Sequence, residues 1–526
     1  MAKTQHGRRP SRRTTGVVAA TALTLVATLA ACGAGGSGGS SAGGDDGELT
    51  IGLAFPPQSL DPGKNGGGGQ NIVQWLTYEP LIRMESDGSL SPALATEWGY
   101  VGEGNTAFEL TLREGVTFAD GTPVDADAVV ATLEHYLANP AALSHFLNGI
   151  SEVTADGPTT VRIALSEPNP VLPLVLSQAA NWGDVISPAG LADPTQLTTD
   201  TFGAGPYELD ETATVAGDTY TFLPNENYWQ PELQHYDRVV VKVLPDPNSA
   251  LQALRTGQID VDMNGNGTLA DQAEELGAEV LRGNASASAV FVLDRAGTVT
   301  PALGEPEVRE ALNTAIDRDA IAAALGTGYA PTQQVATEGS DGFDAGLDDT
   351  YEYDPERARE LLADAGYPDG FSFTMLTTDL LGLSTVAQAV AGQLAEIGVD
   401  VTVESTGTDL NRLIADMASQ QYSAVTFVMG GDMYPNALQN FVSAQSPLNP
   451  FASEDPGITA AFDTLAASAE DGRETAAQEL NRAVVETAWF VPAVTSEGFV
   501  FTRGIADPGT VGTGGVLDVL SWRPAA

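Results

Sequence analysis

The chain is 526 residues long, which is enough for several domains with large buried cores. Aspartate and glutamate outnumber lysine and arginine 70 to 23, giving a formal net charge of −47. So acidic a chain repels nucleic acids and anionic lipid headgroups, which excludes both as partners, and we expect the charge to lie on a solvated surface.

Residues 1–31 have the composition of a secretory signal peptide. Basic residues precede an apolar run from Gly16 to Ala31, which is too short for a membrane-spanning helix. The run ends in LAAC at 29–32, which resembles the lipobox of bacterial lipoproteins. This predicts lipid attachment at Cys32 and a location at the cell membrane, facing the extracytoplasmic side. The alternative is an ordinary cleavage site with an incidental cysteine. Because Cys32 is the one cysteine of the chain, no disulfide is expected.

A flexible tether and the first strand come next. Residues 32–48 are rich in glycine and serine and cannot form a packed core. A strand is expected over 49–55. A loop with four consecutive glycines at 66–69 then precedes a helix over 71–78.

The stretch 106–136 carries a clear local pattern. Apolar residues at alternate positions predict a half-buried strand, namely Phe108, Leu110 and Leu112. After two turns rich in glycine and proline, Asp125 stands where a helix N-cap belongs, and apolar residues recur at helical spacing from Val129.

In the second half of the chain, predicted helices and strands alternate, which favours an α/β lobe. A helix begins at Pro306, and Asp354 caps another that ends before Gly366. Further strands are expected over 371–377, 399–404, 422–429 and 489–494, with helices over 386–397, 410–419 and 479–489.

The run LREGVTFADGTPVDADAVV, within the stretch 106–136, resembles the signature of the family 5 extracellular solute-binding proteins of ABC importers, the oligopeptide, dipeptide and nickel binders. Other segments are similar to landmarks of the same family: LDP at 60–62, YEPLI at 78–82, PALATEW at 92–98 and GAGPY at 203–207. In the last of these, Ala204 stands where the family usually has threonine.

This resemblance implies an α/β protein with a two-lobed periplasmic-binding-protein type II fold and an extra subdomain inserted in lobe I. Lobe I is expected to comprise residues 49–78, 187–290 and 489–526, with the extension subdomain at 79–186. Lobe II is expected at 291–488.

The resemblance also implies ligand-binding residues. Asp432 aligns with the aspartate that takes the α-amino group of the peptide in peptide-binding relatives, and Gly431 before it allows close approach of the backbone. Met429 stands where the family often has tryptophan, so the stacking contact that tryptophan makes with a ligand is missing. This departure favours a non-peptide ligand, whereas Asp432 itself matches the peptide-binding pattern. The alternative is a plain Gly-Gly-Asp turn. Gln70, after the glycine run, and Trp182 are further candidates; core packing is the alternative for Trp182.

Catalytic and metal-binding patterns are weak. No two histidines have the spacing of a helical zinc motif, and GGSGG at 35–39 fits a nucleophile elbow only in the tether. The segment 260–271 approaches an EF-hand loop but has aspartate at the last position and no entering helix. We therefore expect no catalytic residue, no metal site, no cofactor and no enzymatic activity.

Together these observations predict a monomeric, lipid-anchored substrate-binding component of an ABC importer. It would capture a small solute, a short peptide by preference, between two lobes and deliver it to the transmembrane permease subunits. Alternatives are a non-peptide solute such as a sugar or a metal chelate in the same fold, a secreted hydrolase, and a calcium-dependent adhesion or sensor module.

Overall fold

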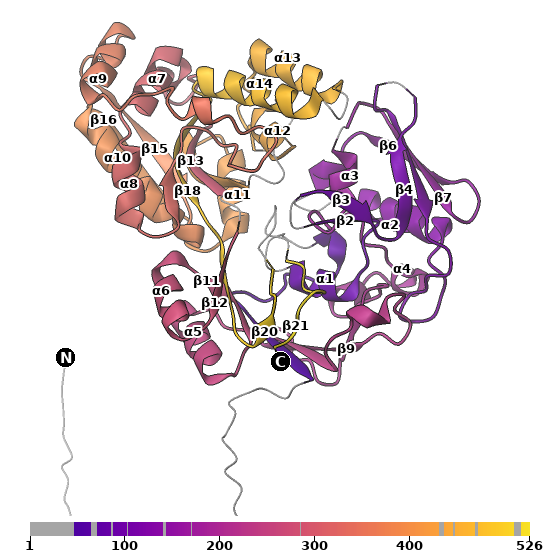
Figure 1. Cartoon of the computed structure of the whole chain (residues 1–526). Helices are drawn as coiled ribbons and strands as arrows, with labels where there is room; N and C mark the ends of the chain where they lie inside the picture. Colours follow the sequence, from indigo (N-terminus) through magenta and orange to yellow (C-terminus); the bar gives the residue numbers. More distant parts are fainter. Residues whose placement is uncertain are drawn as a thin grey trace, which may run out of the picture. The chain divides into compact units, whose positions relative to one another are not determined.

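The described part of the chain is organised around three β-sheets (Figure 1). The computed structural model describes residues 47–64, 71–85, 88–102, 104–139, 144–169, 171–283, 286–430, 436–444, 446, 448–468, 472–509 and 517–525. Within these residues the strands form a seven-stranded, a six-stranded and a four-stranded sheet, with two additional pairs. The predicted signal peptide lies outside the described residues, as does nearly all of the tether.

The seven-stranded sheet has the order β12-β19-β11-β1-β10-β9-β8. β1 (Glu48–Leu53) runs parallel to β10 (Arg238–Val243) and to β11 (Val261–Gly265), and the other pairs are antiparallel. The remaining strands are β8 (Tyr207–Leu209), β9 (Thr219–Pro224), β12 (Glu279–Arg282) and β19 (Phe499–Thr502). Helices α5 (Pro247–Thr256) and α6 (Gly267–Glu275) pack on this sheet beside β11 and β12 (Figure 1).

The six-stranded sheet has the order β14-β18-β13-β17-β15-β16. Its central strand β13 (Ser286–Val292) shows why both faces are covered: Val290 and Val292 belong to one apolar core, whereas Ala289 and Phe291 belong to another. The remaining strands are β14 (Tyr329–Pro331), β15 (Phe371–Thr377), β16 (Val399–Ser405), β17 (Ala424–Gly430) and β18 (Phe490–Ser496).

Helices cover the two faces of the six-stranded sheet, as expected for an α/β unit. They are α7 (Pro306–Thr314), α8 (Arg318–Leu325), α9 (Pro355–Asp364), α10 (Leu383–Glu396), α11 (Leu410–Ala418), α12 (Asn436–Val442), α13 (Pro456–Ala466) and α14 (Arg473–Glu486). The predicted cap of α9 is confirmed: the Asp354 carboxylate accepts from the amides of Glu356 and Arg357, and Gly366 has a φ of 94° after the helix.

The four-stranded sheet is antiparallel, with the order β4-β5-β7-β6. The predicted alternation is confirmed in β5 (Ala107–Leu112), where every second residue is buried. Helix α2 (Ala126–Ala138) packs beside β6 and β7, and its predicted cap is confirmed because the Asp125 carboxylate accepts from the Ala128 amide at 3.0 Å. The other strands are β4 (Ala95–Tyr100), β6 (Ile150–Ala155) and β7 (Thr160–Leu165).

Short elements complete the described chain. They are α1 (Ile72–Thr77), α3 (Leu172–Val175), α4 (Pro188–Ala192), the pair β2 (Ile82–Met84) and β3 (Leu90–Pro92), and the pair β20 (Ile505–Ala506) and β21 (Arg523–Pro524).

The chain passes between the seven-stranded and six-stranded sheets twice, after β12 and after β18. The two crossings lie side by side: the Gly283 amide donates to the Gly498 carbonyl at 2.8 Å, and Arg282 forms an ion pair with Glu497 at 3.0 Å. The predicted lobe boundaries at 290/291 and 488/489 do not coincide with these crossings. Most of β13 and all of β18, which the sequence assigned to lobe I, pair within the six-stranded sheet.

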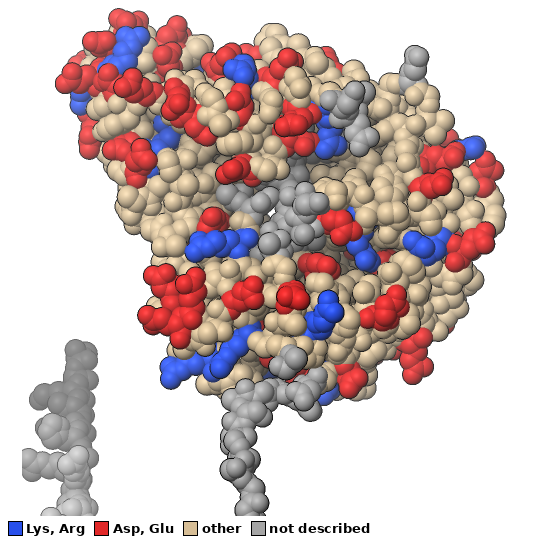
Figure 2. Space-filling model, in the orientation of Figure 1, with Lys and Arg blue, Asp and Glu red and all other residues tan. Residues whose placement is uncertain are grey.

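The acidic excess lies largely at the surface. Figure 2 shows red carboxylate side chains spread over the whole of the face in view, with fewer blue side chains among them. No single acidic patch dominates this face, which agrees with the expectation of a solvated acidic surface.

The N-cap of α2 gives a direct test of local stability. Replacing Asp125 with alanine removes the acceptor of the Ala128 amide, so we expect the free energy of unfolding to fall by about 1 kcal/mol. Urea unfolding of Asp125→Ala and Asp125→Asn measures it, because asparagine keeps a capping oxygen and should retain most of the stability. Equal stability of wild type and Asp125→Ala would show that the cap contributes nothing.

Candidate ligand-binding site

The parallel strands of both sheets end on the side where the crossings run. In the six-stranded sheet, the first residue of β13, Ser286, pairs with Gly430 at the end of β17, and β15 and β16 run parallel to β17. In the seven-stranded sheet, Gly265 at the end of β11 pairs with Phe499 at the start of β19, and β1 and β10 run parallel to β11. Since ligands of open α/β sheets bind beyond the carboxyl ends of strands, these two edges define the candidate site.

The edge of the seven-stranded sheet carries a buried carboxyl group at Asp262, in β11. This side chain has no exposed surface. Its Oδ1 accepts from the Asn264 amide at 2.8 Å, whereas its Oδ2 has no hydrogen-bond partner in the described structure. Burial raises the pKa of Asp262 to about 6, and the hydrogen bond from Asn264 opposes this only in part.

The edge of the six-stranded sheet is tied together by hydrogen bonds between the loops that follow β15 and β16. The Thr378 hydroxyl and the Asp379 amide both donate to the Gly407 carbonyl, at 2.8 Å each. Beside them, the Thr426 hydroxyl of β17 donates to the Thr377 hydroxyl at 2.6 Å. These contacts fix the ends of β15 and β16 relative to each other and to β17.

The structure places two of the predicted ligand residues in different cores. The Met429 side chain is buried in the core between the six-stranded sheet and helices such as α11. Trp182 is buried in the core of the four-stranded sheet, edge-to-face against Tyr136 with the ring centroids 5.2 Å apart. Their contact with a ligand stays a prediction. Gln70, Gly431, Asp432 and the lipid-attachment residue Cys32 lie outside the described residues.

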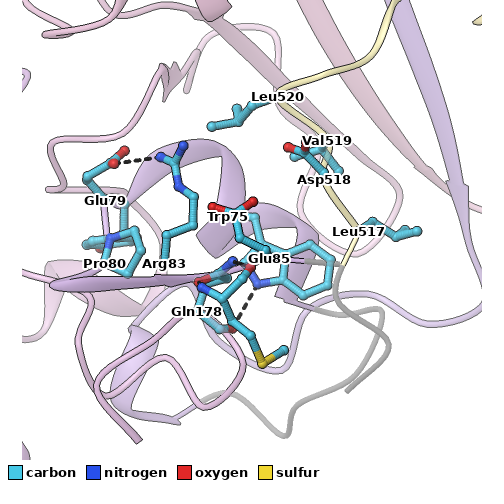
Figure 3. Close-up of a pocket in the computed structure, with 12 residues that line it drawn as sticks. Trp75, Glu79, Pro80, Arg83, Glu85, Gln178, Leu517, Asp518, Val519 and Leu520 are labelled. Carbon is cyan, nitrogen blue, oxygen red and sulfur yellow. Dashed lines mark hydrogen bonds and ion pairs between the residues drawn. The ribbon is translucent and has the colours of Figure 1, made fainter. Parts of the chain in front are cut away.

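A small cavity of about 80 Å³ lies between α1, β2 and the segment Leu517–Leu520 (Figure 3). Its wall contains Trp75, whose indole N–H donates to the Gln178 carbonyl at 3.0 Å. The charged groups around it are Glu79, Arg83, Glu85 and Asp518.

Glu79 and Arg83 form a partly buried ion pair beside this cavity, with Nη2 of Arg83 2.8 Å from Oε1 of Glu79. The second carboxylate oxygen of Glu79 accepts from the Tyr228 hydroxyl at 3.1 Å. Burial raises the pKa of Glu79, although Arg83 and Tyr228 stabilise its charged form. Both oxygens of Glu79 are therefore engaged, and the carboxylate holds the guanidinium in place.

No local pattern in the sequence predicts this charged group. Glu79 and Arg83 are four residues apart, but Glu79 precedes strand β2 and Arg83 lies within it, so no helical spacing marks them as partners. Asp518 is more than 400 positions away in the chain. Only the YEPLI landmark at 78–82 pointed to the neighbourhood.

The segment 260–271 does not assemble a group of carboxylates. Oδ2 of Asp260 accepts from the Thr50 amide at 2.8 Å, and Asp262 is turned to its own Asn264 amide. Among the residues that the structure describes, no three or more His, Cys, Asp or Glu side chains are placed to hold a metal ion.

The fold matches that of known periplasmic binding proteins. The binding protein AgaA in complex with agropinic acid, from A. tumefacien R10, superposes with a TM-score of 0.74 over 91% of this chain and 98% of that chain, at 23% sequence identity. The periplasmic binding protein DppA from Helicobacter pylori, in complex with the peptide STSA, gives 0.74 over 91% and 97%, at 22% identity. The α/β architecture is therefore the type II periplasmic-binding-protein fold.

Sequence comparison identifies the family. The model for bacterial extracellular solute-binding proteins, family 5, matches residues 89–449, and the chain belongs to this family. The glutathione-binding protein GsiB of Escherichia coli O1:K1 / APEC is 29% identical over 380 residues, which span 70% of this chain and 71% of that protein. For GsiB of Escherichia coli K12 the identity is 30% over 347 residues, and both shares are 65%.

The buried carboxyl group of Asp262 predicts a pH-dependent effect. The pKa of Asp262 in the folded state, about 6, lies above the ordinary value of 3.8. The carboxyl group is therefore protonated in both the folded and the unfolded state below pH 3.8, and the folded state loses stability as the pH rises from 3.8 through 6. Asp262→Asn keeps the acceptor for Asn264 and cannot ionise. We expect it to raise the free energy of unfolding by about 1–3 kcal/mol at pH 8 and to change little at pH 4.

Urea unfolding between pH 4 and pH 8 measures this difference. Asp246→Asn serves as a matched control, because hydrogen bonds from Ser249 lower the pKa of the Asp246 carboxylate at the N-cap of α5. The stabilising effect of the charged Asp246 carboxylate is present at neutral pH and is lost on acidification. Its dependence on pH is therefore opposite in sign to that expected for Asp262. A stability difference between Asp262→Asn and wild type that does not vary with pH would contradict the assignment.

Proposed function

We propose that the protein captures a small solute outside the cytoplasm and delivers it to the transmembrane subunits of an ABC importer. The observation that carries this proposal is the family match over 89–449, which includes the four-stranded sheet and most of the six-stranded one. The position of both sets of strand ends beside the crossings supports a binding site there.

The solute is proposed to be a short peptide or a compound built like one. The GsiB relatives are named for binding glutathione, and the DppA structure contains the peptide STSA. The AgaA structure contains agropinic acid, so a non-peptide solute remains the second candidate. Asp432 is proposed to pair with a solute ammonium group, because the family resemblance aligns it with the aspartate that takes the peptide α-amino group in peptide-binding relatives.

Binding without catalysis is proposed as the whole activity of the chain. The family is described as solute-binding, and its members need a specific and reversible site rather than a reactive one. The alternative function from a different class of protein, a secreted hydrolase, would need a nucleophilic side chain beside a general base.

Capture is proposed to occur by closure of two lobes about the crossings. Lobe I would comprise the seven-stranded sheet with the four-stranded extension, and lobe II the six-stranded sheet with its helices. Backbone residues at Gly283 and at 496–499 would absorb the rotation, as in other hinge-closing proteins. The protein is proposed to work as a monomer.

The protein is proposed to be held at the membrane by a lipid on Cys32, with residues 33–48 as a tether. Among the described residues, the structure contains no helix of the length and apolarity that a membrane crossing requires. The basic and apolar leader followed by LAAC is the support for the anchor.

The ligand proposal is tested with the peptide Ser-Thr-Ser-Ala and its N-acetylated form. Native mass spectrometry of protein purified without refolding should first reveal a bound small solute. After its removal, calorimetry should show that wild type binds the free peptide and rejects the acetylated one. In Asp432→Asn, binding should weaken by about 2–5 kcal/mol, because the ammonium is buried without its partner.

Two outcomes separate the parts of this proposal. If wild type binds both forms equally, solute binding stands but the ammonium contact at Asp432 does not, and a non-peptide solute is favoured. If no peptide, glutathione or co-purified solute binds or raises the melting temperature, the proposal of a solute-binding protein fails.

The anchor predicts that Cys32→Ala leaves the mature domain folded but no longer retained by membranes. The substitution removes the predicted site of lipidation, which precedes the first strand, β1, by 16 positions in the sequence. Cell fractionation with immunodetection measures the distribution, and Ser37→Ala in the tether is the control that should stay in the membrane fraction. A Cys32→Ala protein that remains membrane-bound after leader removal would contradict lipid anchoring.

A further inference from the structure

The loop after β15 contains a tight turn with an unusual residue at its centre. Leu381 has a φ of 54° and a ψ of 22°, and Gly382 has a φ of 72° and a ψ of 8°. The Leu383 amide donates to the Leu380 carbonyl, which closes the turn. These angles define a type I′ β-turn, in which both central residues have positive φ. Asn-Gly is the usual central pair of such a turn, because asparagine and glycine enter this region at little cost.

Leu381 is an outlier in two independent respects. Seven described non-glycine residues have a positive φ, and Leu381 is the one among them with a large apolar side chain. Its side chain is also 71% exposed, the highest value among the large apolar residues that the structure describes. A leucine in the left-handed region costs conformational energy, and here little burial within the protein offsets that cost. The turn would be more stable with asparagine at this position.

The backbone on both sides of the turn is anchored. Before it, the Thr378 hydroxyl and the Asp379 amide both donate to the Gly407 carbonyl, at 2.8 Å each. After it, the buried side chain of Leu383 begins α10. Because both ends are held, the loop that presents Leu381 would lose little further freedom on contact with another molecule.

This turn lies at the edge that forms the candidate ligand site. β15 runs parallel to β17, and Leu381 follows its last residue, Thr377, by four positions. Two further exposed apolar side chains follow the carboxyl ends of parallel strands: Phe55, two residues after β1, and Leu410, five residues after β16. A single exposed leucine is ordinary on a protein surface, but strain and exposure that coincide at a ligand edge indicate a functional contact.

The chemistry of the leucine side chain selects what it contacts. Leucine offers no hydrogen bond and no charge, so only the burial of apolar surface can stabilise a contact with it. Ligand sites commonly combine an apolar lining with a few polar groups that fix orientation. The nearest carboxylate in the sequence, Asp379, accepts a hydrogen bond from the Ser405 hydroxyl at 2.9 Å. The position of Leu381 therefore favours an alkyl or aromatic group over a charged one.

We propose that Leu381 contacts an alkyl or aromatic side chain of the solute and selects solutes that carry one. This inference rests on the proposed function and adds a specificity-determining contact to it. The strain at Leu381 in the free protein is then offset only when the solute covers the side chain.

Calorimetry with Ser-Thr-Ser-Ala and four analogues, each with leucine at one of its positions, tests the proposal. Wild type should bind at least one leucine peptide about 5- to 10-fold more tightly than the parent, because the added side chain is partly buried against Leu381. Leu381→Asn should lose that preference and bind the parent peptide as wild type does. Leu381→Met, which keeps the apolar surface, should retain most of the preference.

Thermal unfolding of the free protein supplies an independent readout. Leu381→Asn should melt about 1–2 °C above wild type, because asparagine adopts positive φ at lower cost and the exposed leucine makes few contacts that the substitution would remove. Higher stability together with weaker binding of apolar solutes is expected of a residue that serves the ligand. A lower melting temperature would show that Leu381 packs within the protein, and it would overturn the proposal.

Val101→Asn is the matched control. Val101 is also exposed, but it follows β4 in the four-stranded sheet, so its replacement should leave the preference for leucine peptides unchanged. Loss of the preference in Val101→Asn as well would show an effect that is not specific to Leu381, and it would overturn the proposal.

A preference for leucine peptides that persists in Leu381→Asn would overturn the contact while solute binding stands. The same conclusion follows if wild type binds the parent peptide, glutathione or a co-purified solute but prefers none of the leucine peptides. If wild type binds no peptide, no glutathione and no co-purified solute, the proposed function fails and this inference fails with it.

Discussion

Two short backbone segments determine how the rest of the structure is arranged. At residues 282–286 and 496–499 the chain leaves one sheet and enters the other, and the Gly283 amide holds the two segments together through the Gly498 carbonyl. Because β12 is antiparallel to β19 and β13 is antiparallel to β18, the chain passes the two crossings in opposite directions. The ends of the parallel strands in both sheets are thereby brought to the side of the crossings, where a ligand site can form.

The crossings also explain glycines whose neighbours leave no room for a side chain. Gly328 has a φ of 89°, and a Cβ there would lie 2.6 Å from the Phe499 ring. At the start of α6, a Cβ on Gly267 would lie 1.8 Å from the Thr327 carbonyl oxygen. The first residue of α6 thus contacts the turn before β14. The Glu497 amide donates to the Gly328 carbonyl of the same turn. Close backbone packing of this kind leaves the crossings little freedom except rotation about their own bonds.

The chain has few basic residues, and some of them serve inside the protein rather than on its surface. Arg318 is buried and donates to the Pro492 carbonyl of β18 and to the side chain and backbone of Asn313. Burial lowers its pKa to about 10, so it remains charged at neutral pH. In a chain with 70 acidic residues, a cation satisfied by backbone carbonyls holds β18 against α7 and α8 without a buried carboxylate partner.

Local features could be read from the sequence, and distant pairings could not. The caps at Asp125 and Asp354 and the extent of β15 depend on neighbouring residues, so periodicity and turn chemistry predicted them. The family resemblance supplied the two-lobed fold. The assignment of β13 and β18 failed because strand pairing across about 200 residues leaves no local trace. The same reason hid the group of Glu79, Arg83 and Asp518, as well as the burial that shifts the pKa of Asp262.

The order of the strands along the chain has a consequence for the timing of folding. β18 lies between β14 and β13, and β19 lies between β12 and β11, so both sheets receive an inner strand from residues 490–502, near the end of the chain. A nascent polypeptide that stops before Phe490 can complete neither sheet, and its long-range pairings must wait for the last part of synthesis. Late completion keeps these two sheets unfinished while the chain is being made. That property suits a polypeptide for which the composition of residues 1–31 predicts export across a membrane before folding.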